Sequence, residues 1–185
     1  MVVRIDREIT LPEHLDDIVD GELYEFVDGE PVEKHMGAES DEIALRLGGR
    51  MQTFAEAHTL GRVYGGTTGY RNCFPHAPRL LRKPDVSFVA ESRLPDGRTP
   101  RGDFSIAPDL AVEVVSPNDA YEEVSRKVSD YKLAGVKLIW VIDPATKTVL
   151  VRRLDRSCAE LDETGTLSGE DVIPGFTCPV AELFV

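Results

Sequence analysis

Two carboxylates stand where a folded chain normally places apolar side chains. Glu113 lies within Leu110–Pro117, LAVEVVSP, a stretch that otherwise has the composition of a buried strand. A carboxylate buried in a strand costs several kcal/mol unless something pairs with it. Asp85 follows a proline at the start of a second expected strand, and carboxylates on neighbouring strands raise each other's pKa by repulsion. A divalent cation removes that conflict, and Mg²⁺ prefers oxygen ligands, of which the protein supplies only a few. The pair therefore predicts a site for Mg²⁺ or Mn²⁺.

Lys127 could complete such a site from a helix that follows Glu113. The expected helix runs from Asp119 to Ala134, and Lys127 flanks its apolar stripe, which is formed by Tyr121, Val124, Val128 and Tyr131. A positive group beside a bound metal would orient water or offset the charge that develops on a phosphate. The alternative is that Lys127 lays its stem along the core and keeps its ammonium in water. Lys132 lies further round the helix and Lys137 lies in the next expected strand, so both are weaker candidates.

A third acidic residue, Glu39, lies near the start of a long amphipathic helix expected over residues 38–57. Ile43, Leu47, Met51 and Phe54 recur there at helical spacing, and one turn back from Ile43 is Glu39. This spacing predicts that Glu39 begins the core-facing stripe. The alternative is ordinary stabilisation of the helix N-terminus by an acidic side chain.

These residues need a sheet to bring them together. Strands are expected over residues 84–90 and 110–116, and the helix over 119–134 then leads to a strand over 136–143 that is apolar enough to be covered on both faces. Strand, helix and strand in this order form a βαβ unit, which implies a mixed sheet with helices on its faces. Ligands of such sheets usually bind beyond the carboxyl ends of the strands.

Shorter elements complete the expected fold. Residues 21–32 contain an Asp-Gly step between apolar patches and predict a β-hairpin. Residues 61–71 predict two short strands, and residues 91–107 predict a loop that covers the site or only connects strands. The final part of the chain predicts short strands at one edge, over residues 148–153, 159–161 and the last stretch.

Length and composition indicate one globular domain over residues 1–185. The chain is 42% hydrophobic and 29% charged, and no apolar run approaches the roughly 20 residues that span a bilayer. The charged N-terminal stretch lacks the apolar core of a secretory signal, so we expect a cytoplasmic protein. The three cysteines, Cys73, Cys158 and Cys178, are widely spaced and indicate neither a disulfide framework nor a zinc site.

The net charge of −12 argues against tight, unspecific binding to nucleic acid, but its distribution weakens that argument. Residues 1–42 carry 14 acidic and 3 basic side chains, so the rest of the chain is nearly balanced. The segment from Arg79 to Gly102 is modestly basic. Arg79, Arg82 and Lys83, just before Asp85, are candidates for contacts with a phosphate backbone, although solvated loop charges would look the same.

Four motifs together resemble the Uma2 family of putative restriction endonucleases, which belongs to the PD-(D/E)XK nuclease superfamily. The motifs are RKPDVSFV at residues 82–89, PDLAVEVVSP at 108–117, Lys127 with YKLAGV at 131–136, and IWVIDP at 139–144. The resemblance covers nearly the whole chain. It implies an α/β fold in which helices flank a mixed central β-sheet, with an N-terminal hairpin and C-terminal edge strands.

The resemblance also implies roles for individual residues. Asp85 matches the motif aspartate and Glu113 the motif glutamate. The superfamily places a lysine two residues after the glutamate, but this chain has Val115 there. In this family the lysine is thought to have moved to the following helix, which fits Lys127, and the Val115 carbonyl could still bind the metal. Glu39 would be the glutamate that the superfamily carries on its first helix. A histidine is common near that helix start, but His35 lies several residues earlier.

The leading hypothesis is therefore a Mg²⁺- or Mn²⁺-dependent endonuclease that hydrolyses phosphodiester bonds in DNA, with a homodimer as one expectation. Asp85 and Glu113 would hold the metal, Lys127 would position water or offset charge, and Glu39 would orient a water molecule. A second hypothesis is a cleavage-inactive nuclease fold that acts as a binding or regulatory module. A third is that Asp85 and Glu113 are structural and pair with arginines.

Overall fold

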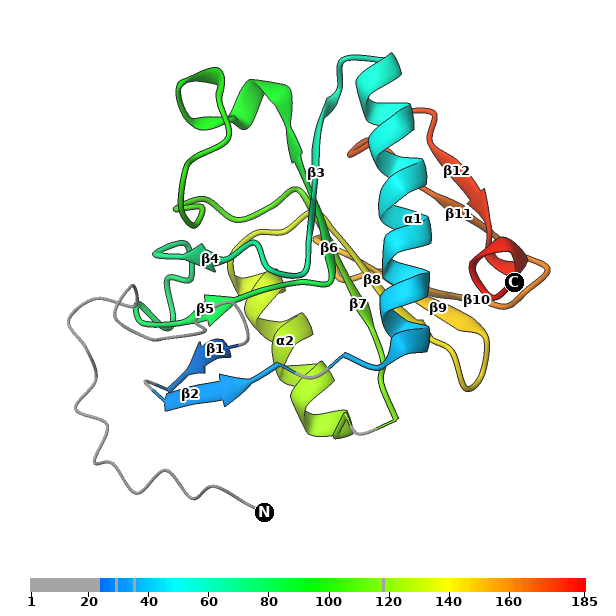
Figure 1. Cartoon of the computed structure of the whole chain (residues 1–185), viewed down its shortest axis with the longest axis horizontal. Coiled ribbons are helices and arrows are strands. Elements are labelled where there is room, and N and C mark those ends of the chain that lie inside the picture. The colour runs from blue at the N-terminus through cyan, green and yellow to red at the C-terminus, as the bar shows by residue number, and fades with distance from the viewer. Residues whose placement is uncertain (1–23, 29, 35, 118) are drawn as a thin grey trace.

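A computed structural model places residues 24–28, 30–34, 36–117 and 119–185 (Figure 1). The α-helices of these residues are α1 (Ala38–Ala57) and α2 (Tyr121–Leu133). The strands of the described residues are β1 (Tyr24–Val27), β2 (Glu30–Glu33), β3 (Gly61–Gly65), β4 (Tyr70–Arg71), β5 (Leu81–Arg82), β6 (Val86–Ala90), β7 (Leu110–Val114), β8 (Leu138–Asp143), β9 (Thr148–Arg153), β10 (Cys158–Leu161), β11 (Thr166–Ser168) and β12 (Thr177–Pro179). Short 3₁₀ turns are η3 (Glu91–Arg93), η4 (Pro95–Gly97) and η5 (Val180–Leu183).

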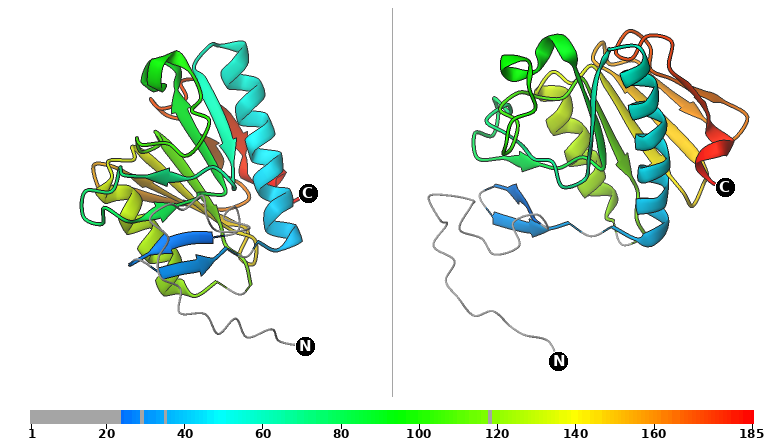
Figure 2. Two further views of the ribbon diagram at one scale, coloured as in Figure 1. Left: turned by 60° about the vertical axis from the view of Figure 1, so that its left-hand side comes forward. Right: turned by 45° about the horizontal axis from the view of Figure 1, so that its top comes forward.

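A six-stranded mixed sheet forms the centre of the molecule, with the strand order β10-β9-β8-β7-β6-β3. Its parallel pair is β7 and β8, which α2 connects, and its other pairs are antiparallel. Helix α1 covers one face of the sheet and α2 covers the other (Figure 2). The predicted βαβ unit and the mixed α/β fold are therefore confirmed.

Helix α1 forms where the sequence predicts it. Its buried residues Ile43, Leu47 and Met51 recur at the spacing of a helix face that packs against the sheet. The prediction that Glu39 begins this stripe is wrong, because the buried residue of the first turn is Ser40 and Glu39 is exposed. Ser40 precedes Ile43 by three residues and Ala44 by four, so it shares their face.

Strand β7 is buried along its whole length, and its side chains alternate between the two faces of the sheet. Leu110, Val112 and Val114 belong to the core that includes α1, whereas Ala111 belongs to the core that includes Tyr131 of α2. Glu113 is two residues after Ala111, so its side chain points to the same face of the sheet. The strand therefore turns its one carboxylate toward α2.

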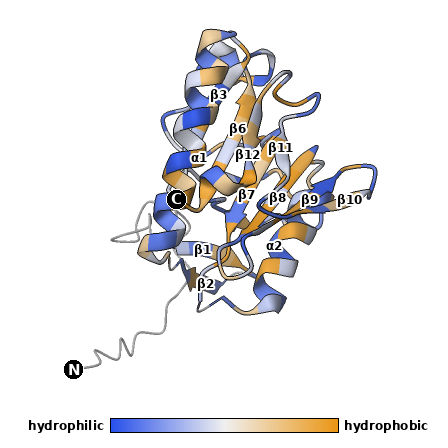
Figure 3. Ribbon diagram, turned by 90° about the vertical axis from the view of Figure 1, so that its right-hand side faces the viewer, coloured by the Kyte–Doolittle hydropathy of each residue, from blue (hydrophilic) through white to orange (hydrophobic). Residues whose placement is uncertain are grey.

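Two hydrophobic cores lie on opposite faces of the central sheet. The core on the α1 face also contains side chains from β11, β12 and η5, including Leu167, Cys178 and Leu183. The core on the α2 face joins the sheet to a second, four-stranded sheet with the order β2-β1-β5-β4. Figure 3 shows that the central strands β6, β7 and β8 are mainly hydrophobic.

The ends of the chain differ in part from the prediction. The described part of the predicted hairpin, β1 with β2, is confirmed, and residues 21–23 and 29 lie outside the described residues. Strands β9 and β10 extend the central sheet at its edge as predicted. The last two strands, β11 and β12, pair only with each other in a separate two-stranded sheet instead of extending that edge.

Residues 91–107 connect β6 to β7 and pack into the α2-side core. Leu94, Phe104 and Ala107 are buried there, and Phe104 forms a β-bridge with Tyr70. This segment is therefore packed against the rest of the fold along part of its length. Among the helices that the structure describes, none combines the length and apolarity needed to cross a bilayer.

Candidate functional site

Asp85 and Glu113 stand opposite each other on neighbouring strands. In the antiparallel pair of β6 and β7, Val86 faces Val112, and the backbone N–H of Asp85 donates to the Val112 carbonyl over 2.9 Å. Continuing that register by one residue places Asp85 opposite Glu113. Both residues are buried, with 6% and 4% of their surface exposed. The structure thus brings together the two carboxylates that the sequence singled out.

Two side chains of α2 hold the Glu113 carboxylate. The Lys127 ammonium donates to Oε2 over 3.1 Å, and the Tyr131 hydroxyl donates to Oε1 over 2.6 Å. Burial raises the pKa of Glu113 to about 7, against the attraction of Lys127 and with added repulsion from Asp85. Glu113 is therefore poised to exchange a proton near neutral pH.

Lys127 is drawn into the interior by this contact. Its side chain is 11% exposed. Burial opposes its charge, but Glu113, Glu25 and Asp85 outweigh burial and raise the pKa of Lys127, which therefore stays protonated at neutral pH. The prediction that Lys127 reaches back to the strand is confirmed, and the alternative of an ammonium in water is wrong.

The buried face of α2 is more polar than the sequence indicated. Its buried residues are Lys127, Asp130 and Tyr131, whereas Tyr121, expected in the apolar stripe, is 85% exposed. The buried face of the helix includes charged residues because their partners lie on the strands: Lys127 contacts Glu113 of β7, and Asp130 contacts Arg82 of β5. Tyr131 was expected only as a core residue, but its position four residues after Lys127 places it on the same helix face.

Asp85 is held by a backbone amide and by a second lysine. Its Oδ2 accepts from the Val114 N–H over 2.7 Å, and its Oδ1 pairs with the Lys34 ammonium at 2.8 Å. Lys34 follows the end of β2 and also donates to the carbonyl oxygens of Lys83 and Gly66. Lys34 was not expected at the site, because no periodicity or motif around it indicates a partner next to β6.

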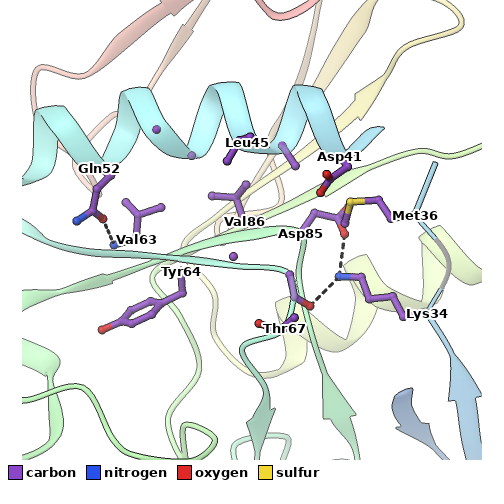
Figure 4. Close-up of a pocket in the computed structure, with 15 residues that line it drawn as sticks. Lys34, Met36, Asp41, Leu45, Gln52, Val63, Tyr64, Thr67, Asp85 and Val86 are labelled. Carbon is purple, nitrogen blue, oxygen red and sulfur yellow. Dashed lines mark hydrogen bonds and ion pairs between the residues drawn. The ribbon is translucent and has the colours of Figure 1, made fainter. Parts of the chain in front are cut away.

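A cavity of about 540 Å³ leads to Asp85. It lies between α1, β3 and the start of β6, and its lining includes Lys34, Asp41, Gly48, Tyr64 and Asp85. Figure 4 shows Lys34 extending to Asp85 at one end of the cavity, with Gln52 and Val63 toward the other end. Glu113 does not line this cavity, so a ligand that enters it meets Asp85 first.

Helix α1 and the end of β7 meet through Ser40. The Ser40 hydroxyl donates to the Val115 carbonyl over 3.2 Å and accepts from the Ser116 hydroxyl over 3.1 Å. Glu39, the predicted helix glutamate, is exposed beside it. The residue that α1 presents to the end of β7 is thus a hydroxyl and not the predicted carboxylate.

Two of the three basic residues proposed for phosphate contacts are buried. Arg82 is 1% exposed, and its guanidinium donates to Glu25 over 2.7 Å and to Asp130 over 2.9 and 2.6 Å. Lys83 is 4% exposed. The prediction that Arg82 and Lys83 contact DNA is wrong, because neither side chain is presented at the surface. Arg79 is exposed and stays a prediction.

The oxygen atoms at Asp85 are suited to a hard divalent cation. The described residues contain no group of three or more His, Cys, Asp or Glu side chains that could hold a metal ion, so a site here depends on two carboxylates, backbone oxygen and water. Mg²⁺ is often bound in this way. Asp85 Oδ1 and two carbonyl oxygens already surround one positive charge, the Lys34 ammonium. The residues therefore fit a cation at Asp85.

The two carboxylates contact lysines, a tyrosine and a backbone amide. Within the part of the chain that the structure describes, neither Asp85 nor Glu113 pairs with an arginine. This contradicts the hypothesis of a structural pair neutralised by arginines. The arginine of this region, Arg82, instead neutralises Glu25 and Asp130.

Comparisons with known proteins bear on the family and the fold of the chain. A family model described as Uma2, putative restriction endonuclease, matches residues 12–181. A crystal structure of a putative nuclease belonging to DUF820 from Anabaena variabilis ATCC 29413 is similar at a TM-score of 0.80 and 22% sequence identity. The similarity covers 95% of this chain and 97% of that one, and it shows a shared fold. No curated protein matches the chain.

Proposed function

From the membership of this chain in the Uma2 family of putative restriction endonucleases, we propose that it is a metal-dependent endonuclease that hydrolyses phosphodiester bonds in DNA. The observation that supports this most directly is the pairing of Asp85 with Glu113 beside Lys127. Two facing carboxylates lie beside a buried ammonium, and one of them, Asp85, lines an open cavity. These are the groups that hydrolysis of a phosphate ester needs.

Asp85 and Glu113 would hold one Mg²⁺ or Mn²⁺, and the Val115 carbonyl would supply a further oxygen. That carbonyl accepts one hydrogen bond, from Ser40, and has a second lone pair. When bound, such a cation polarises the scissile phosphate and makes water more acidic. The remaining task of the chain is to position the phosphate and the water.

Lys127 and Tyr131 keep the Glu113 carboxylate in one orientation by holding one oxygen each. Burial and the charge of Glu113 raise the pKa of the Tyr131 hydroxyl, so it stays a donor. In the proposed reaction the Lys127 ammonium offsets negative charge that develops on the phosphate. Glu39, exposed at the start of α1, would orient a water molecule only from the outer rim of the site.

A nuclease assay on plasmid and single-stranded DNA with Mg²⁺ or Mn²⁺ tests the proposal. We expect Glu113→Gln and Lys127→Ala to lower the cleavage rate by roughly 10²-fold or more, because each removes a charged group at the site of charge development. Lys132→Ala is the matched control, because it changes a lysine of the same helix that is outside the site. Equal cleavage by the wild type, Glu113→Gln and Lys127→Ala would refute the assigned site.

A cleavage-inactive binding module is the second candidate. One observation favours it: all four carboxylate oxygens of Asp85 and Glu113 already have partners within the chain. This candidate predicts DNA binding, measured by fluorescence anisotropy, with no cleavage at any divalent cation concentration.

A further inference from the structure

The Lys34 ammonium occupies a ring of three oxygens on the cavity side of Asp85. It lies 2.8 Å from Asp85 Oδ1, 2.6 Å from the Lys83 carbonyl and 3.2 Å from the Gly66 carbonyl. All of these contacts join parts of the chain that are distant in sequence. The side chain is 9% exposed, so this is a built position for a positive charge and not a surface ion pair.

The neighbouring backbone leaves room for this ammonium. A Cβ atom at residue 66 would lie 3.1 Å from Lys34 Nζ, which is closer than ordinary van der Waals contact, and Gly66 has no such atom. Lys34 itself lines the cavity of about 540 Å³. An unbranched lysine side chain beside open space can leave its oxygens by rotating about its own bonds.

A divalent cation and this ammonium would compete for the same carboxylate oxygen. A metal on Asp85 Oδ1 would lie well within the range at which two positive charges repel strongly in a partly buried site. The Val114 amide already holds the other oxygen of Asp85. Metal binding to Asp85 is therefore linked to departure of the ammonium from Oδ1.

We propose that Lys34 is a resident counter-ion of Asp85 that a divalent cation must displace, so that Lys34 sets the metal affinity of the site. This inference rests on the proposed function, because it concerns the metal site of the proposed endonuclease. It makes Lys34 a residue that controls binding, with a role distinct from that of Lys127, which contacts Glu113. Its displacement adds a cost to metal binding that a neutral side chain would not add.

Calorimetric titration of the full chain with Mg²⁺ alone, at pH 8 and without DNA, tests the inference. We expect Lys34→Met to bind Mg²⁺ with a dissociation constant at least about tenfold lower than that of the wild type, because the competing charge is gone. The increase in melting temperature caused by Mg²⁺ should be larger in the variant for the same reason. If Lys34→Met does not fold, Lys34→Gln provides the same comparison, because it removes the charge and keeps a donor.

Two further variants separate the possible results. Lys147→Met removes an exposed lysine that pairs with Glu163, and it should leave Mg²⁺ affinity unchanged. Adding Asp85→Asn to Lys34→Met should abolish the gain in affinity. Unchanged or weaker Mg²⁺ binding by the Lys34 variants, with cleavage by the wild type still dependent on Mg²⁺, would overturn the inference and leave the proposed function intact. Failure of the wild type and all Lys34 variants to bind Mg²⁺ would instead overturn the proposed metal site.

Discussion

Each carboxylate of the site has its own lysine, and the two lysines come from different parts of the fold. Lys127 belongs to the crossover helix and contacts Glu113, whereas Lys34 follows the hairpin and contacts Asp85. The two acids differ in access, because Asp85 lines the cavity and Glu113 does not. At the scale of single residues, the site therefore has one carboxylate that a ligand in the cavity can reach, Asp85, and one that it cannot reach directly, Glu113.

The buried carboxylate of Glu113 should make the free energy of unfolding depend on pH. The pKa of Glu113 is raised from its usual value near 4.5 to about 7 in the folded protein, mainly by burial. The folded state therefore holds a proton more tightly than the unfolded state, so this contribution to stability is present in full below pH 4.5 and is lost as the pH rises through 7. Relative to Glu113→Gln, the wild type should lose free energy of unfolding across this window, by at most about 1.4 kcal/mol per pH unit.

Urea unfolding of both proteins at several pH values between 4.5 and 8, without divalent cations, measures this difference. Glu160→Gln, a change at an exposed glutamate of β10, serves as the control and should run parallel to the wild type. Parallel curves for the wild type and Glu113→Gln would show that the proton affinity of Glu113 does not change on folding.

At the scale of elements, a buried charge network fastens the hairpin to the crossover helix. Arg82 of β5 lies between Glu25 of β1 and Asp130 of α2, and the Lys83 amide donates to Glu25 over 2.7 Å. Burial works against the charge of Glu25, but Lys127 and Arg82 outweigh it and lower the pKa of Glu25. One set of compensating charges thus connects β1, β5, α2 and the residue that follows β5.

Removing the central cation of this network should be costly. Arg82→Met leaves Glu25 and Asp130 buried without the guanidinium that pairs with both, and we expect a loss of roughly 3–5 kcal/mol in the free energy of unfolding. Arg79→Met, three residues earlier and exposed, should change it by less than about 0.5 kcal/mol. Urea denaturation compares the two variants, and equal stability would show that the network does not support the fold.

The sequence predicted the elements whose signal is local. Helix α1 was placed at its observed bounds because Ile43, Leu47 and Met51 have strict helical spacing, and the βαβ unit followed from the order of its parts. Asp85, Glu113 and Lys127 were found because a charged residue among apolar ones is visible in one dimension. Lys34 and Ser40 were missed because their roles depend on contacts with residues 32 to 76 positions away. The buried position of Arg82 depends in the same way on Glu25 and Asp130, which the sequence does not pair with it.

At the scale of the whole molecule, the charge distribution limits how DNA can be held. The chain carries a net charge of −12, and of the three basic residues expected at the site only Arg79 is exposed. We therefore expect few contacts between this site and DNA phosphates. A homodimer, which would double the contacts, stays a prediction.

The salt dependence of DNA binding should accordingly be shallow. Without divalent cation, we expect the logarithm of the association constant to fall with the logarithm of the KCl concentration with a slope no steeper than about −3, because each phosphate contact contributes about 0.9. Arg79→Met should reduce the slope by about one contact, and Arg156→Met, in the turn between β9 and β10, should not. Fluorescence anisotropy across KCl concentrations measures these slopes, and a slope of −6 would contradict this account.

The Lys34 ammonium at Asp85 also holds separate backbone segments together. Through it the chain after β2 is tied to the turn after β3 at Gly66 and to the segment before β6 at Lys83. Withdrawing that one group releases three pieces of backbone at once, on the rim of the cavity. Displacement of the Lys34 ammonium by a cation would therefore loosen the loop at Gly66, and amide hydrogen exchange around Gly66 would become faster.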